Sequence, residues 1–185
     1  MSGAIVDCSR EQVPDTLTVE ICIVGSGCGG ATAARELAQA GHEVLVLEEG
    51  ADLTGLQLTQ RDGAMYDQLY MDRGGRSTVD LSISVLQGRV LGGGGVINAS
   101  DVVPITDETL LHWQKKYGLT DFSPRTLGPF REAALADLHA NLPPLAQLNS
   151  NNRLLQSGAE ALGWKGEVML HNRVGCAGIG ACLLG

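Results

Sequence analysis

The chain has 185 residues, 44% of them hydrophobic, and a formal net charge of −8 at pH 7. This length supports one hydrophobic core, and the composition is that of a folded globular protein rather than a disordered one. The acidic balance disfavours a surface that follows nucleic-acid phosphates, so we expect no nucleic-acid partner. The 25 glycines are clustered, which suggests backbone that lies close to a ligand.

The first 18 residues are expected to form a polar leader before a domain that spans residues 19–185. They contain neither the basic region nor the apolar region of a secretory signal. No apolar run approaches the roughly 20 residues of a membrane span. The five cysteines cannot all pair internally, so free thiols rather than metal ligands are expected. These observations predict a cytoplasmic protein with no metal and no membrane span.

A strand, a helix and a second strand are predicted within the first 50 residues. Residues 19–24 (VEICIV) are nearly all apolar, which is typical of a strand buried on both faces of a parallel sheet. The Ala-rich segment 28–40 predicts a helix with Gly41 at its C-terminal cap, and residues 44–47 (VLVL) predict the second strand. This order is a βαβ unit, so the predicted fold class is α/β with a Rossmann-like FAD/NAD(P)-binding core.

The remaining regular structure is predicted to be helical. A short helix is expected near Met65–Tyr70, inside the otherwise irregular stretch 51–87. No repeat or low-complexity linker marks a domain boundary. Further helices are predicted over 107–117 with Thr106 or Asp107 as cap, from Ser123–Pro124 to about Leu138, and over 149–162 ending at Gly163.

The segment 25–30 (GSGCGG) matches the G-x-G-x-x-G pattern and lies between the predicted strand and helix. Gly25 allows the tight turn, Gly27 lets the backbone approach a pyrophosphate, and Gly30 lets the helix pack closely on the strand. The free N–H groups and the dipole at the helix start favour phosphate. The sequence therefore predicts a dinucleotide site at this turn.

Glu48 ends the second predicted strand, 18 residues after Gly30. A carboxylate at this position accepts hydrogen bonds from the adenosine ribose hydroxyls and repels a 2′-phosphate, which disfavours NADP. The pattern at the turn leaves both FAD and NAD open.

Residues 88–98 (GRVLGGGGVIN) form a second glycine cluster. The segment closely resembles the first signature of the glucose–methanol–choline (GMC) oxidoreductase family: a Gly-Arg start, an aliphatic residue, two glycines, two small residues and an aliphatic-Asn pair. Beyond Asn98 the sequence departs from that signature, at Val102 and Ile105.

The resemblance implies the FAD-binding portion of a flavin-dependent oxidoreductase that acts on CH–OH donors and passes hydride to the flavin N5. Four bare glycines in the second cluster would accommodate a flat flavin ring. In the family, positions equivalent to Cys28, Gly29, Glu48 and Gly94 contact FAD, and the equivalent of Asn98 lies beside the flavin. The expected cofactor-binding residues are Gly25, Gly27, Cys28, Gly29, Gly30, Glu48, Arg89, Gly93, Gly94 and Asn98.

Relatives in this family take their catalytic histidine from a C-terminal region, so no catalytic residue is expected here. The tail, residues 176–185 with Cys176 and Cys182, resembles a Cys/Gly-rich stretch of the family's long-chain alcohol oxidase branch. We expect a family fold that is incomplete, lacks the substrate domain, and is a truncated and inactive portion by itself. The histidines that do not match the catalytic positions are His42, His112, His139 and His171.

Two alternatives remain open at this point. A separately encoded, complementary C-terminal chain would complete the site of a nucleotide-binding module. An NAD-dependent Rossmann dehydrogenase would use the same turn with a different cofactor. The expected partners are otherwise FAD and, in a full-length parent, a small alcohol substrate.

Overall fold

The computed structural model describes residues 3–53, 57–59 and 61–176. It divides the chain after Ala99 into two compact units, which are described separately below. Cys182 and most of the Cys/Gly-rich tail lie outside the described residues.

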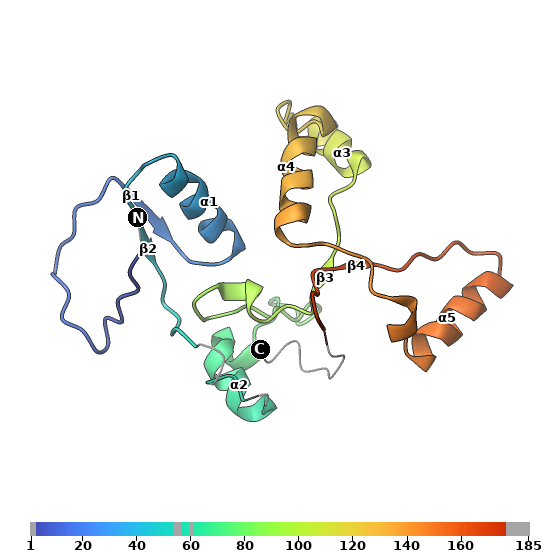
Figure 1. The fold of residues 1–185 in the computed structure, drawn as a ribbon, viewed down its shortest axis with the longest axis horizontal. Helices are drawn as coiled ribbons and strands as arrows, with labels where there is room; N and C mark the ends of the chain where they lie inside the picture. Colours follow the sequence, from blue (N-terminus) through green and yellow to red (C-terminus); the bar gives the residue numbers. More distant parts are fainter. Residues whose placement is uncertain (1–2, 54–56, 60, 177–185) are drawn as a thin grey trace. The chain divides into compact units, whose positions relative to one another are not determined.

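The first unit begins with a βαβ arrangement (Figure 1). Strands β1 (Ile21–Val24) and β2 (Val44–Leu47) pair in parallel, and α1 (Cys28–Gln39) connects them and packs on them. The helix ends at Gln39 with Ala40 as its C-cap, and Gly41, which follows, has a φ of +95° in the region that favours glycine. The predicted α/β class with a Rossmann-like start is therefore confirmed.

The prediction that the first strand is buried on both faces is wrong. The strand begins at Ile21, and its side chains alternate between half-buried and exposed. Ile23 faces α1, whereas Val24 is 85% exposed and Leu47 49% exposed. Among the described residues, β1 and β2 contact each other and α1 but no further helix or strand. One face of this two-stranded sheet is therefore covered and the other is bare.

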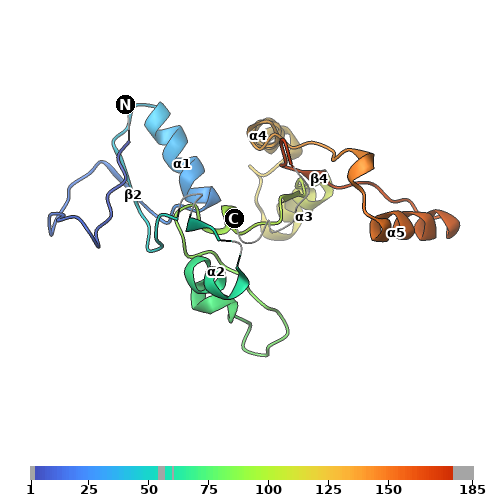
Figure 2. The same ribbon diagram turned by 60° about the horizontal axis from the view of Figure 1, so that its bottom comes forward.

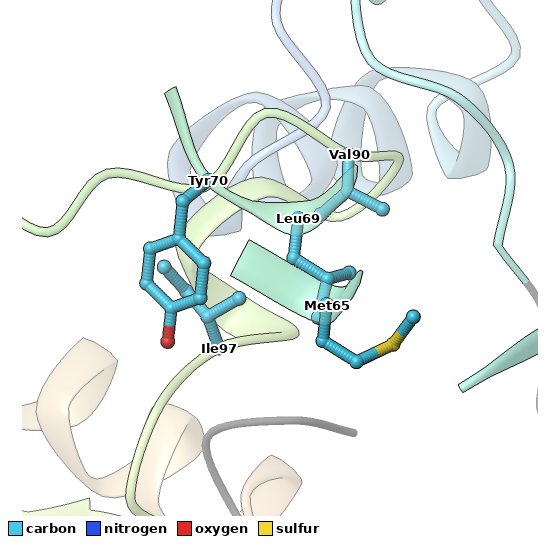
Figure 3. Close-up of a cluster of buried hydrophobic side chains, with 5 residues drawn as sticks. All are labelled: Met65, Leu69, Tyr70, Val90 and Ile97. Atoms are coloured by element: carbon cyan, nitrogen blue, oxygen red, sulfur yellow. The ribbon is translucent and has the colours of Figure 1, made fainter. Parts of the chain in front are cut away.

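Helix α2 (Asp62–Leu69) confirms the short helix that was predicted near Met65 and supplies part of a buried apolar cluster (Figure 3). The other part comes from residues just before and just after the glycines 92–95, which include the one-turn helix η3 (Gly93–Gly95). Burial therefore anchors both ends of the second glycine cluster. The five buried side chains, each at most 6% exposed, are Met65, Leu69, Tyr70, Val90 and Ile97.

Backbone hydrogen bonds hold the start of the second glycine cluster between two other segments. The Arg89 N–H donates to the carbonyl of Leu69 at 2.7 Å, and the Leu91 N–H donates to the carbonyl of Ala51 at 3.0 Å. The first bond joins the cluster to the end of α2, which continues into the short helix η2 (Met71–Gly74). The second joins the cluster to the segment that follows β2.

In the second unit, α3 (Asp107–Tyr117) packs against α4 (Pro124–Asp137). Thr106 and Ser123 cap these helices through side-chain oxygens that accept backbone N–H bonds at 3.2 and 3.0 Å. The Arg131 guanidinium connects the pair by donating to Asp107 at 2.8 Å. Both predicted helices and the Thr106 and Ser123 caps are confirmed.

The rest of the second unit is a short antiparallel pair and a helix that stands apart from α3 and α4 (Figure 2). Strand β3 (Asp101–Val102) pairs with β4 (Leu170–His171). After η4 (Leu145–Gln147), helix α5 (Ser150–Ala161) begins at an Asn149 cap and ends before Gly163, as predicted. Within the described residues, no helix has the length and apolar content to cross a membrane.

Leu69→Ala is expected to lower the free energy of unfolding by about 2–5 kcal/mol, because Leu69 is fully buried and its removal leaves a cavity. Urea denaturation followed by circular dichroism measures this loss. The control is Leu155→Ala on α5, where the side chain is 74% exposed and the change should stay within about 0.5 kcal/mol. Equal losses in the two variants would contradict the observed core.

Candidate cofactor site

The turn after β1 starts the site. Strand register places Val24 opposite Leu47, and the Gly25 N–H extends the pairing by donating to the Leu47 carbonyl at 2.7 Å. Gly25 then turns the chain with a φ of +93°, a conformation that glycine adopts without a steric penalty. The residues that follow are therefore directed across the carboxyl ends of both strands.

Gly30 allows the first turn of α1 to lie against the end of β1. A Cβ at Gly30 would overlap the carbonyl oxygen of Gly25 and approach the side chain of Ile23 to 3.4 Å. This is the close helix–strand packing that the third glycine of the pattern was expected to provide. The fold itself therefore requires glycine at this position.

Gly27 and Gly29 differ from Gly25 and Gly30, because the described structure does not require glycine at either one. Gly27 has a φ of −61°, and a Cβ at Gly27 or Gly29 would meet only open space. Gly27 is the N-cap of α1 and provides no side-chain cap to the helix N–H groups. Open space in front of a helix N-terminus fits a phosphate group, which would approach the bare backbone there.

Glu48 lies beside this turn, immediately after β2. One of its carboxylate oxygens accepts a bond from the Ser26 N–H at 2.9 Å and another from the Ser26 hydroxyl at 2.6 Å. The other oxygen accepts a bond from the Gly50 N–H at 2.8 Å. The carboxylate is thereby fixed at the position where a ribose hydroxyl would meet it in a Rossmann site.

The pKa of Glu48 lies below its usual value. Partial burial alone would raise the pKa, but the hydrogen bonds from Ser26 and Gly50 favour the charged form and outweigh that effect. Glu48 is therefore ionised at neutral pH and can only accept hydrogen bonds, such as those that a ribose hydroxyl would donate.

The second glycine cluster meets the first. The Gly92 N–H donates to the Ser26 hydroxyl at 2.8 Å. A Cβ at Gly93 would lie 3.0 Å from the Cα of Gly27, and a Cβ at Gly95 would lie 3.3 Å from the sulfur of Cys28. Two glycine-rich segments, far apart in the sequence, therefore lie backbone against backbone.

Three other predicted residues lie along the second cluster. Gly94 is exposed, and a Cβ there would meet only open space. The Asn98 amide donates to the carbonyl of Gly95, so it lies against the same backbone. The Arg89 side chain is half-exposed, with its Nε 3.7 Å from a carboxylate oxygen of Glu49. The structure thus brings both glycine clusters and Glu48 together, while direct contact of any of these residues with a cofactor stays a prediction.

Sequence reasoning missed Ser26 and Gly50. Ser26 occupies a variable position of the G-x-G-x-x-G pattern, yet its hydroxyl bonds both Glu48 and Gly92. A Cβ at Gly50 would overlap the backbone N of Val90, so Gly50 admits the second cluster beside the strand end. The pairing of two parallel strands could have indicated Ser26, since residues that follow such strands meet at one sheet edge.

In the part of the chain that the structure describes, no group of three or more His, Cys, Asp or Glu side chains is placed to hold a metal ion.

The site has the parts of a Rossmann-type dinucleotide-binding site: parallel strand ends, a glycine turn, a helix N-terminus and a carboxylate at the end of the second strand.

Comparison with protein families adds the particular family. A model described as "NAD(P)-binding Rossmann-like domain" matches residues 23–88. The GMC oxidoreductase family model matches residues 66–185, which is more than half of the chain. The chain belongs to the GMC oxidoreductase family.

Similar proteins agree with this assignment. An uncharacterized GMC-type oxidoreductase of Mycobacterium tuberculosis is 34% identical over 93% of this chain and 28% of its own length. A long-chain-alcohol oxidase of Arabidopsis thaliana is 28% identical over 97% of this chain and 24% of its own length. The fold also matches the crystal structure of pyridoxine 4-oxidase from Mesorbium loti with a TM-score of 0.60 and 19% identity, over 85% of this chain and 37% of that one. The chain thus spans about a quarter of the length of the Mycobacterium tuberculosis and Arabidopsis thaliana relatives.

Gly30→Ala is expected to lower the free energy of unfolding by about 1–3 kcal/mol, because the added methyl overlaps the Gly25 carbonyl. Urea denaturation measures the loss. Gly29→Ala is the matched control on the same helix turn: its methyl meets open space, and alanine favours helix, so its stability should be equal or higher. A Gly30→Ala variant as stable as the control would contradict the packing described.

Glu48 is expected to make the fold sensitive to acid. Its pKa is lower in the folded chain than in the unfolded one, so its stabilising effect is complete above the unfolded pKa. The effect is lost as the pH falls through the folded pKa. Urea denaturation across this acidic range should therefore show a smaller loss of stability in Glu48→Gln than in the wild type. Glu49→Gln, which removes a carboxylate that Ser26 does not contact, should retain the wild-type acid response.

Proposed function

We propose that residues 19–98 hold FAD for a flavin-dependent oxidoreductase that acts on CH–OH donors. The observation that carries the proposal is the convergence of the two glycine clusters through the Gly92–Ser26 hydrogen bond. One cluster starts a helix whose N-terminus suits a diphosphate, and the other offers bare backbone that suits a flat ring.

The residues present fit FAD at both of its ends. Glu48 is ionised and fixed, which suits the adenosine ribose, and Gly27 and Gly29 leave the helix N-terminus open to the diphosphate. Gly94 is exposed without a side chain, which suits the flavin ring. When bound, the flavin would supply the two-electron acceptor for hydride from the donor carbon. The chain's own residues bind and orient that cofactor.

Alcohol as the donor class rests on the relatives. Several matching proteins of Arabidopsis thaliana are named long-chain-alcohol oxidases. We infer an alcohol substrate for the full-length parent on that similarity.

We further infer that residues from outside this chain complete the site and that the chain alone does not turn over. The bare face of the β1–β2 sheet and the chain's coverage of about a quarter of its relatives support this inference. Those residues would come either from the continuation of the same polypeptide or from a complementary C-terminal chain.

An NAD-dependent dehydrogenase is the second candidate, and the Rossmann-like match over residues 23–88 favours it. That match covers the diphosphate turn and Glu48, which both cofactors would use. The glycines 92–95 lie beyond it, and their fit to a flavin ring favours FAD.

Equilibrium dialysis of the 185-residue chain against FAD, NAD and ADP tests the proposal. We expect FAD to bind more tightly than NAD, because the second glycine cluster adds contacts to the flavin ring that nicotinamide would not make. The same sample should show no loss of visible flavin absorbance when alcohol is added. Preferential binding of NAD would refute the flavin assignment, and bleaching by alcohol would refute the inactivity of the chain.

A matched pair of glycine variants locates the ring in this experiment. Gly94→Leu should weaken FAD binding but leave ADP binding unchanged, because its side chain would fill the space assigned to the ring. Gly166→Leu adds the same side chain at another exposed glycine with open space around it, and should change neither affinity. A Gly94→Leu variant that retains wild-type FAD affinity would place the ring elsewhere.

A further inference from the structure

Ser26 is a buried polar residue, 7% exposed, in the variable position between Gly25 and Gly27. Its hydroxyl is the middle of a directed chain of hydrogen bonds. The Gly92 N–H donates to the Ser26 oxygen at 2.8 Å, and the Ser26 hydroxyl donates to Glu48 at 2.6 Å. These two partners lie 66 and 22 residues away in the sequence.

The chemistry of Glu48 and Gly92 fixes which group donates in each of these two hydrogen bonds. An ionised carboxylate can only accept and a backbone N–H can only donate, so the hydroxyl proton must point to Glu48. The oxygen lone pairs are then available to Gly92. A hydrogen bond to a charged acceptor is about twice as strong as a neutral one, and successive bonds polarise one another.

The hydroxyl can be separated from the rest of the turn. The backbone N–H of Ser26 donates to the same carboxylate oxygen at 2.9 Å, and that bond does not need the side chain. Removing the hydroxyl therefore leaves Glu48 with its bonds from the backbone N–H groups of Ser26 and Gly50. It breaks only the connection from Glu48 to the second glycine cluster.

We propose that Ser26 is a positioning residue whose hydroxyl holds the ribose-binding carboxylate of Glu48 and the ring-binding backbone at Gly92–Gly95 in one fixed arrangement. The ribose-binding half and the ring-binding half of the site are then already ordered relative to each other when one FAD binds across both. This inference rests on the proposed function, because the two halves matter together only for a ligand that reaches both.

The first test examines the two hydrogen bonds of the Ser26 hydroxyl in the absence of a ligand. NMR titration of Glu48 and amide hydrogen exchange at Gly92 are measured in wild type, Ser26→Ala and Ser26→Thr. We expect Ser26→Ala to raise the pKa of Glu48, because a donor to its charged form is lost, and to speed exchange of the Gly92 amide. Ser26→Thr keeps a hydroxyl and should restore both values towards those of the wild type.

The controls take account of the neighbouring charged residues and of a second hydroxyl group nearby in the sequence. Glu49 and Arg89 are the charged side chains next in sequence to this site; they pair with each other at 3.7 Å, and none of the variants changes either residue. Thr32→Ala removes a different hydroxyl, one that donates to the Cys28 carbonyl within α1 at 2.7 Å. That control should change neither the Glu48 titration nor the Gly92 exchange.

The second test measures binding of ADP and FAD by calorimetry. Ser26→Ala should weaken FAD binding on the order of tenfold, the size expected for one hydrogen bond to a charged group. ADP binding should weaken less, since ADP reaches only one half of the site. In a Glu48→Ala background the further effect of Ser26→Ala on ADP binding should disappear, because the hydroxyl acts on ADP through Glu48. A purely structural loss would instead add to the Glu48→Ala effect.

The outcomes separate the two proposals. If the wild-type chain binds neither ADP nor FAD, the proposed function fails and the positioning role fails with it. If it binds FAD but Ser26→Ala leaves the Glu48 titration, the Gly92 exchange and the FAD affinity unchanged, the positioning role alone is overturned. Additive losses of ADP affinity in the double variant would also overturn it.

Discussion

Close approach of two backbone segments is the constraint on which the rest of the first unit depends. The Gly92 N–H reaches the Ser26 hydroxyl, and a Cβ at Gly93 would lie only 3.0 Å from the Cα of Gly27. Only glycine permits such contact without displacement of one segment. The glycines therefore do more than free the chain to turn, since they allow two distant parts of the sequence to share one surface.

Apolar burial fixes the second glycine cluster of that surface, and strand pairing fixes the first. Val90 and Ile97 are buried on either side of the second glycine cluster, so the glycines between them are fixed without needing side chains of their own. The parallel register of β1 and β2 carries Glu48 to the first cluster. Neighbouring side chains thus fix the position of a binding surface that consists of glycine backbone.

In the first unit, one face of the β1–β2 sheet is covered and the other is not. Helix α1 packs on the face that Ile23 occupies, while Val24 and Leu47 remain exposed. In a Rossmann-type fold both faces of a parallel sheet are normally covered. This bare face is one of the two observations that support the proposal of residues from outside the chain.

The sequence by itself determined the local elements and the type of site. Apolar runs, capping residues and glycine positions predicted β2, the three long helices of the second half and the short helix near Met65, because these depend on neighbouring residues. The tertiary structure alone decided the bare strand face, the division after Ala99 and the part played by Ser26. Each of these depends on which distant segments meet, and a residue such as Ser26 acquires two partners only when the strands pair and the glycines approach each other.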